Sequence, residues 1–266
     1  MITALRMPES PEAAAEAVAG GGRVMAGGTV VMAQVNTGPI DAGELISLSR
    51  AGLSGVTVTG GVARVGATTT FADLARHLPF LKPAIRTLAS PSIRNLATVG
   101  GNLFVPQPHG DFAVCLEALD ATVELTGGRE TPVGQLELGA GEIVTAVRFR
   151  VPEDGTWFFH KAMRRRLNSA AIVTVAATVR RTGNDVSAAR VALGAVAPRV
   201  IRSPAAENVL LGRPLDREVL DAAGEAARAD IAPFDDAYAS AWYRRRVLPV
   251  HFRRTFEAVQ SETEES

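Results

Sequence analysis

Two pairs of adjacent glycines point most directly to chemistry in this sequence. Gly27 and Gly28 follow a short apolar run, and Gly100 and Gly101 stand just before Asn102. Glycine adopts positive φ values easily and lets another group approach the backbone closely. Consecutive amides in such turns form concavities that bind anions. Two turns of this kind suit a ligand with two adjacent phosphates.

Polar side chains lie at the rim of the second turn, where Thr98 and Asn102 add hydrogen-bonding groups. Neither turn matches a common phosphate fingerprint, because no G-x-G-x-x-G follows a strand and no glycine loop ends in Gly-Lys-Ser or Gly-Lys-Thr. For each loop taken alone, a tight turn between packed elements is the competing interpretation.

The two stretches together carry a specific resemblance. Residues 26–29 and 94–103, with Gly110 and Asp111 after them, resemble the FAD-binding medium subunit of molybdenum hydroxylases. That family includes xanthine dehydrogenase, aldehyde oxidase and carbon monoxide dehydrogenase, and the resemblance covers nearly the whole chain. It implies noncovalent FAD in this chain. It also implies a heterotrimer, with 2Fe–2S clusters in a small subunit and the molybdenum cofactor (molybdopterin) in a large subunit.

The resemblance implies an α+β fold in two parts. A two-lobed FAD-binding domain of the type 2, PCMH-like kind is expected over residues 1–154, with lobes at about 1–54 and 55–154. A smaller α+β domain with a three-stranded sheet and helices is expected over 155–260, because Pro, Glu, Asp and Gly break the chain before it. The polar, acidic residues 261–266 are expected to form a disordered tail.

The resemblance also assigns the cofactor contacts. They are Met25, Ala26, Gly27, Gly28, Thr29, Val30, Thr98, Gly100, Gly101, Asn102, Asp111, Val144 and Lys161. Relatives often have an acidic or small polar residue in place of Val30, so backbone contacts alone are expected there. Asp111 would contact the ribose end or anchor its loop, and capping a helix is an equal alternative. For Val144, packing against the flavin and packing in the core are equally good interpretations.

Lys161 matches a lysine that lies near the isoalloxazine ring in the family. A cation there would stabilise electron density on the reduced flavin, which is how proteins tune bound cofactors. The alternative is an ordinary surface lysine. No residue is expected to be catalytic in the strict sense. His109, beside the second loop, raises the alternative of covalent flavin attachment, which the resemblance disfavours.

Local patterns predict the elements that would position these residues. Ser10, followed by Pro11, begins a helix, and residues 23–25 form a strand that enters the first loop. Residues 56–65 predict a hairpin around a Gly-Gly turn. A helix is expected to begin at or near Asp111, after the second loop.

The C-terminal part predicts a hairpin and three helices. Apolar strands are expected at 170–179 and 186–196, and helices at 205–211, 216–229 and 237–259. The last helix contains three consecutive arginines, residues 244–246, which we expect on a solvated face, with an interface as the alternative.

Composition excludes several classes of function. The 28 basic and 28 acidic residues balance, which offers no electrostatic argument for nucleic acid. The single cysteine, Cys115, excludes a cysteine-held iron–sulfur cluster within this chain, and its apolar neighbours predict a buried side chain. The four histidines, among them His160 and His251, have no metal-ligand spacing. Without a membrane-length apolar segment or a secretory signal, the chain is expected to be cytoplasmic.

The resemblance therefore implies the electron-transfer subunit of an oxidoreductase. Electrons would arrive from the iron–sulfur subunit and pass through FAD to an acceptor such as NAD or a quinone. A stand-alone FAD oxidoreductase of similar fold is one alternative, and a noncatalytic assembly subunit without FAD is another. The resemblance implies that the substrate of the complex is determined in a different chain.

Overall fold

The first glycine loop follows the edge strand of a small parallel sheet. This sheet has the order β1-β3-β2, formed by β1 (Ile2–Arg6), β3 (Gly43–Ser47) and β2 (Arg23–Met25). These elements belong to a computed structural model of the protein, which describes residues 2–37, 43–165 and 168–264 and, of residues 258–264, the backbone only. A tail was expected at residues 261–266. Residues 265 and 266 of that segment lie outside the described residues.

Internal contacts divide the chain into two units. Unit 1 consists of residues 1–82, 89–105 and 121–150, and unit 2 consists of residues 83–88, 106–120 and 151–266. The chain therefore leaves unit 1 twice before it enters unit 2 for its remaining length.

Two helices accompany the parallel sheet of unit 1. In α1 (Pro11–Ala19), the Ser10 hydroxyl accepts a hydrogen bond from the Ala13 amide at 3.1 Å, which confirms the predicted helix start. Ala14 of α1, Ile46 of β3 and Leu48, just after β3, belong to one buried cluster. Helix α2 (Val31–Thr37) begins directly after the first glycine loop.

The second sheet of unit 1 is antiparallel and has five strands. In the order β4-β5-β8-β6-β7, these are β4 (Val56–Thr59), β5 (Val62–Gly66), β8 (Val144–Arg150), β6 (Thr122–Leu125) and β7 (Glu130–Pro132). Strands β4 and β5 form the predicted hairpin. Helices α3 (Phe71–His77), α5 (Pro91–Arg94) and α6 (Val99–Asn102) also belong to this unit, and α6 contains the second glycine loop.

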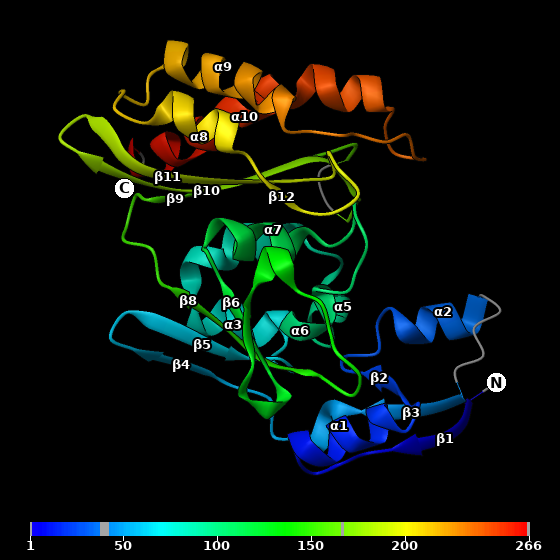
Figure 1. Cartoon of the computed structure of the whole chain (residues 1–266). Helices are drawn as coiled ribbons and strands as arrows, with labels where there is room; N and C mark the ends of the chain where they lie inside the picture. The colour runs from blue at the N-terminus through cyan, green and yellow to red at the C-terminus, as the bar shows by residue number, and fades with distance from the viewer. Residues whose placement is uncertain (1, 38–42, 166–167, 265–266) are drawn as a thin grey trace. The chain divides into compact units, whose positions relative to one another are not determined.

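Unit 2 is a sheet with helices on both faces (Figure 1). The sheet has the order β12-β11-β10-β9, with three long strands, β9 (Trp157–Met163), β10 (Ala171–Thr182) and β11 (Asp185–Gly194), and the two-residue β12 (Ile201–Arg202). Helices α8 (Pro204–Leu210) and α10 (Ala241–Glu264) cover one face, α9 (Arg217–Ala226) packs on these two helices, and α7 (Asp111–Ala118) lies against the other face. The short α4 (Lys82–Thr87) begins in unit 1 and continues in unit 2.

The long helix α10 passes through Pro249 because its neighbours compensate for the proline. Proline has no amide hydrogen, so the carbonyl of Arg245 loses its helical partner. The Arg228 guanidinium donates to that carbonyl, with Nε 3.1 Å from the oxygen. Gly224 of α9 packs against Pro249, where a Cβ would lie 2.8 Å from the proline Cα.

The structure corrects one expectation for α10. Arg244, the first of its three arginines, is fully buried instead of solvated. Its guanidinium donates to the carbonyls of Ala171, Ile172 and Ala195 and to the Asp236 carboxylate, at 2.7–3.1 Å. Arg245 and Arg246 are exposed, as expected.

No helix within the described residues is both long and apolar enough to cross a membrane.

Candidate functional site

The first glycine loop presents unpaired backbone donors. It runs from Ala26 to Val30, and Gly28 has a φ of +70°, which favours glycine. Among the hydrogen bonds between described residues, none uses the amide of Gly27, Gly28 or Thr29 as donor. A row of free amides in a turn is the arrangement that binds an anionic oxygen.

The two glycine loops are brought together by a backbone contact. A Cβ built on Gly27 would lie 1.9 Å from the Leu96 carbonyl oxygen and 3.1 Å from the Ala97 Cα. A Cβ on Gly101 would lie 3.7 Å from that of Ala26. Glycine is therefore required at position 27, because any side chain would separate the first loop from the residues that lead into the second.

The second loop is anchored to the protein by several of its own groups. Thr98 caps α6, with its hydroxyl 3.3 Å from the Gly101 amide. The amides of Val99 and Gly100 donate to the carbonyls of Thr69 and Ala67 at 3.0 and 2.8 Å. These amides are therefore already used, so the free donors that could bind a phosphate belong to the first loop.

The remaining residues of unit 1 that were predicted to contact FAD differ in their exposure to solvent. Val30 is 37% exposed, and the Met25 sulfur packs beside Gly28. Val144 is 5% exposed at the start of β8, where it pairs with Leu125. Val144 therefore packs in the core of unit 1. The carbonyl of the next residue, Thr145, accepts a hydrogen bond from Ala67, and this links β8 to the second loop.

Asp111 and Lys161 form a buried ion pair in unit 2. Lys161 Nζ lies 2.8 Å from Asp111 Oδ2, and the side chains are 3% and 2% exposed. The ammonium also donates to the Thr87 carbonyl at 3.2 Å. Lys161 is thus not a surface lysine. Removing one partner of such a pair leaves an uncompensated buried charge, at a cost of about 3 to 5 kcal/mol.

Thr174 completes this group and was missed by the sequence analysis. Its hydroxyl donates to Asp111 Oδ1 at 2.8 Å, and the residue is fully buried. A signal was present in the sequence, because Thr174 and Thr178 interrupt the apolar run 171–179 of this strand at a spacing that places both on one face. Asp111 is the first residue of α7, and the N-cap position is Gly110.

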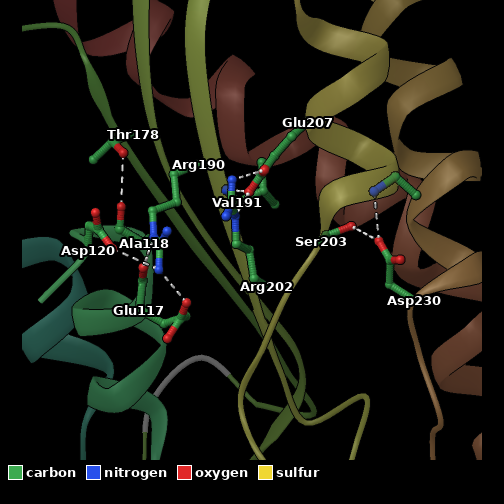
Figure 2. A network of polar contacts seen from close by, with 11 residues as sticks. Glu117, Ala118, Asp120, Thr178, Arg190, Val191, Arg202, Ser203, Glu207 and Asp230 are labelled. Carbon is green, nitrogen blue, oxygen red and sulfur yellow. Dashed lines mark hydrogen bonds and ion pairs between the residues drawn. The ribbon is translucent and has the colours of Figure 1, made fainter. Parts of the chain in front are cut away.

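The C-terminal end of α7 is bonded to the sheet by a polar network (Figure 2). Arg190 donates to the Glu117 carbonyl and carboxylate, both at 2.6 Å, and pairs with Asp120 at 3.0 Å. Thr178 donates to the Ala118 carbonyl at 2.9 Å. Together with the contacts of Asp111, these bonds fix both ends of the helix against the sheet.

Cys115 and the histidines occupy other environments. Burial, with a smaller contribution from the Asp111 charge, raises the pKa of the Cys115 thiol, which confirms the predicted buried side chain. His109 packs edge-on against Tyr238, with ring centroids 5.5 Å apart. Within the described part of the chain, no group of three or more His, Cys, Asp or Glu side chains could hold a metal ion.

Two family models together match most of the chain. Residues 3–152 match the FAD-binding domain in molybdopterin dehydrogenase. Residues 158–259 match the C-terminal domain of the CO dehydrogenase flavoprotein.

Relatives of known function give the same result. The carbon monoxide dehydrogenase medium chain of Afipia carboxidovorans is 29% identical over 83% of this chain and 80% of its own length. The xanthine dehydrogenase FAD-binding subunit of Escherichia coli O157:H7 is 32% identical over 85% of this chain and 84% of its own length. A solved carbon monoxide dehydrogenase from Hydrogenophaga pseudoflava, which lacks the Mo-pyranopterin moiety of its cofactor, superimposes with a TM-score of 0.91, at 27% identity over 98% of both chains.

Proposed function

Since this chain belongs to the family of FAD-binding medium subunits of molybdenum hydroxylases, we propose that it holds FAD noncovalently and carries electrons to a separate acceptor. The observation that supports this most directly is the first glycine loop. Three free amides stand where the Gly27 backbone touches the residues before the second loop. This cradle suits the pyrophosphate of FAD.

The binding energy would come largely from charged hydrogen bonds. A phosphate oxygen that accepts from the amides of Gly27, Gly28 and Thr29 gains about 1.5 to 3 kcal/mol from each bond to a charged group. On the second loop, a Cβ at Gly101 would lie 2.9 Å from the Thr98 hydroxyl oxygen and 3.7 Å from the Ala26 Cβ, so the two loops approach closely there. Backbone donors suffice for this, so Val30 in place of a polar residue is compatible with the proposal.

The flavin ring end is proposed to lie near Lys161 and Val144. Bound FAD supplies chemistry in one- and two-electron steps. The Lys161 ammonium favours negative charge in its surroundings, and the Asp111 carboxylate at 2.8 Å offsets part of that effect. The pair, and not the lysine alone, would therefore set the electrostatic environment of the ring.

We further propose that electrons reach this chain from a partner. With Cys115 as the single cysteine, this chain cannot bind a 2Fe–2S cluster through cysteine ligands of its own. An iron–sulfur small subunit and a molybdopterin large subunit are the expected partners in a heterotrimer. NAD or a quinone is the expected acceptor, and the cytoplasm is the expected location, which cell fractionation would check.

The test begins with the flavin content of the purified full-length chain. We expect a yellow protein with one FAD per chain, and acid precipitation should release the flavin into the supernatant. Flavin that stays in the pellet would contradict noncovalent binding and direct attention to His109. A colourless chain that cannot be reconstituted with FAD would favour the assembly-subunit alternative. Purification of an active flavoenzyme without an iron–sulfur partner would favour the stand-alone alternative.

A further inference from the structure

Thr174 and Lys161 face each other directly across two strands. They are register partners in the antiparallel pair of β10 and β9. Directly opposed residues in such a pair point to the same face, with Cβ atoms about 5 Å apart. The α7 helix covers this face, and its first residue, Asp111, contacts both side chains.

The two oxygens of the Asp111 carboxylate are divided between these partners. Oδ1 accepts from the Thr174 hydroxyl at 2.8 Å, and Oδ2 faces the Lys161 ammonium at 2.8 Å. All three residues are at most 8% exposed, so water does not compete for the carboxylate. The hydroxyl thus keeps one oxygen turned away from the lysine and spreads part of the negative charge into its own hydrogen bond.

We propose that Thr174 is a positioning residue: by holding Asp111 Oδ1, it limits how far the carboxylate neutralises Lys161, and so sets the charge that acts on the flavin. This inference rests on the proposed function, because it requires the flavin ring to lie near Lys161. Without the hydroxyl, both carboxylate oxygens are free to turn to the ammonium. The positive potential from Lys161 then falls, and the reduced flavin is less stabilised.

The chain provides a closely matched control in Thr178. It lies four residues farther along β10 on the same face, and its hydroxyl also bonds to α7, at the Ala118 carbonyl (Figure 2). Replacing either threonine with valine removes one hydroxyl between the same strand and the same helix. Only Thr174→Val affects the carboxylate that pairs with Lys161.

The experiment is a reductive titration of the FAD-loaded full-length chain against a reference dye, after flavin occupancy has been measured. Thr174→Val should lower the midpoint potential by about 30 mV, which is a tenfold change for a two-electron couple. Thr178→Val should keep the parent potential. Thr174→Ser should restore it, because serine returns the hydroxyl. Thr174→Ala repeats the removal if the valine variant does not fold.

Two results would overturn the inference. One is an unchanged potential in Thr174→Val at full FAD occupancy. The other is an equal shift in Thr174→Val and Thr178→Val, since loosening of α7 would then be the cause.

The variant Asp111→Asn separates this inference from the proposed function, because it removes the charge that opposes Lys161 and should raise the potential. If Asp111→Asn shifts the potential and Thr174→Val does not, only the role of Thr174 is wrong. If neither shifts it, the placement of the flavin near Lys161 is wrong as well. A parent chain that binds no FAD contradicts the proposed function itself.

Discussion

At the scale of single residues, the backbone of Gly27 determines whether the two loops can meet. The Leu96 carbonyl oxygen occupies the space that a side chain at position 27 would need. Gly20 offers a comparison, because a Cβ there would have no neighbour closer than 3.4 Å and its φ is −72°. Glycine is therefore required at position 27 by a close backbone contact, whereas position 20 has room for alanine.

Gly27→Ala should separate the loops and lower FAD affinity at least tenfold, because the free amides would no longer converge. Forcing a methyl group into a packed site also costs about 1 to 3 kcal/mol of unfolding free energy. Gly20→Ala should bind FAD like the parent. Equilibrium dialysis with FAD and urea unfolding measure the two effects. Parent-like FAD affinity in Gly27→Ala would show that the loop contact is purely structural.

His160 and His251 make stability depend on pH. Their ring nitrogens lie 3.0 Å apart. Burial, then the neighbouring His160 and Arg254, lower the pKa of His251 to about 4. Burial, then Arg254, also lower the pKa of His160. Between about pH 6.5 and 4 the unfolded chain thus binds more protons than the folded one, so stability falls as the pH falls through this window.

His251→Gln should remove part of this pH dependence. Because water screens a half-buried group, we expect the parent to lose only about 1 kcal/mol more than the variant between pH 7 and 5. Replacing the exposed His77 by Gln serves as the control and should behave like the parent. Urea unfolding at the two pH values provides the comparison. An identical loss in the parent and His251→Gln would show that the pair does not titrate in this range.

At the scale of elements, Arg244 is the side chain that ties α10 to the sheet. It reaches the carbonyls at the start of β10 and stacks over Phe234, with the guanidinium 5.0 Å from the ring centroid. Its neighbour Arg245 donates to carbonyls of the segment that contains Arg228 and Ile231, near the surface. We therefore expect Arg244 to contribute much more than Arg245 to the free energy of unfolding.

Arg244→Met should lower the free energy of unfolding by about 3 to 5 kcal/mol, because Asp236 and three carbonyls lose a buried partner. Arg245→Met should cost less than about 1 kcal/mol. Both variants keep an unbranched side chain, so helix propensity changes little. Urea denaturation followed by circular dichroism measures the difference. Equal costs for the two variants would contradict the anchoring role of Arg244.

The elements that the sequence predicted well depend on short-range chemistry. Ser10 and Thr70 cap helices through amides three residues away, and the glycine turn at 60–61 joins two paired strands. Contacts between distant residues were not predictable. Asp111, Lys161 and Thr174 meet because of strand register and the placement of α7, which no local pattern encodes. The burial of Arg244 has the same origin, because three adjacent arginines look alike in the sequence.

At the scale of the whole molecule, the proposed FAD contacts belong to both units. Gly27, Gly28 and Thr29 lie in unit 1, while Asp111 and Lys161 lie in unit 2. The family models match almost the whole length of the chain, but a family match does not assign individual contacts. Amide hydrogen exchange tests the contacts of each unit separately.

FAD binding should slow amide hydrogen exchange in both units. Protection is expected at residues 27–29 of unit 1 and around Lys161 on β9 of unit 2. Saturation at 100 times the dissociation constant should stabilise the chain by about 2.7 kcal/mol. Exchange measured by mass spectrometry with and without FAD locates the effect, and AMP serves as a control that lacks the flavin. Slowed exchange in unit 1 alone would show that Asp111 and Lys161 do not take part in FAD binding.

The position of α7 in the chain has a consequence for synthesis on the ribosome. Seven of its eight residues are buried, and β10 and β11 supply the surface that covers them. At about 5 to 20 residues per second, translation needs roughly 4 to 15 s to proceed from Ala118 to Gly194, the end of β11. During that interval the apolar side chains of α7, including Phe112 and Leu116, have no native partner from these strands. Apolar surface exposed in this way makes a nascent chain prone to aggregation until β11 has been synthesised.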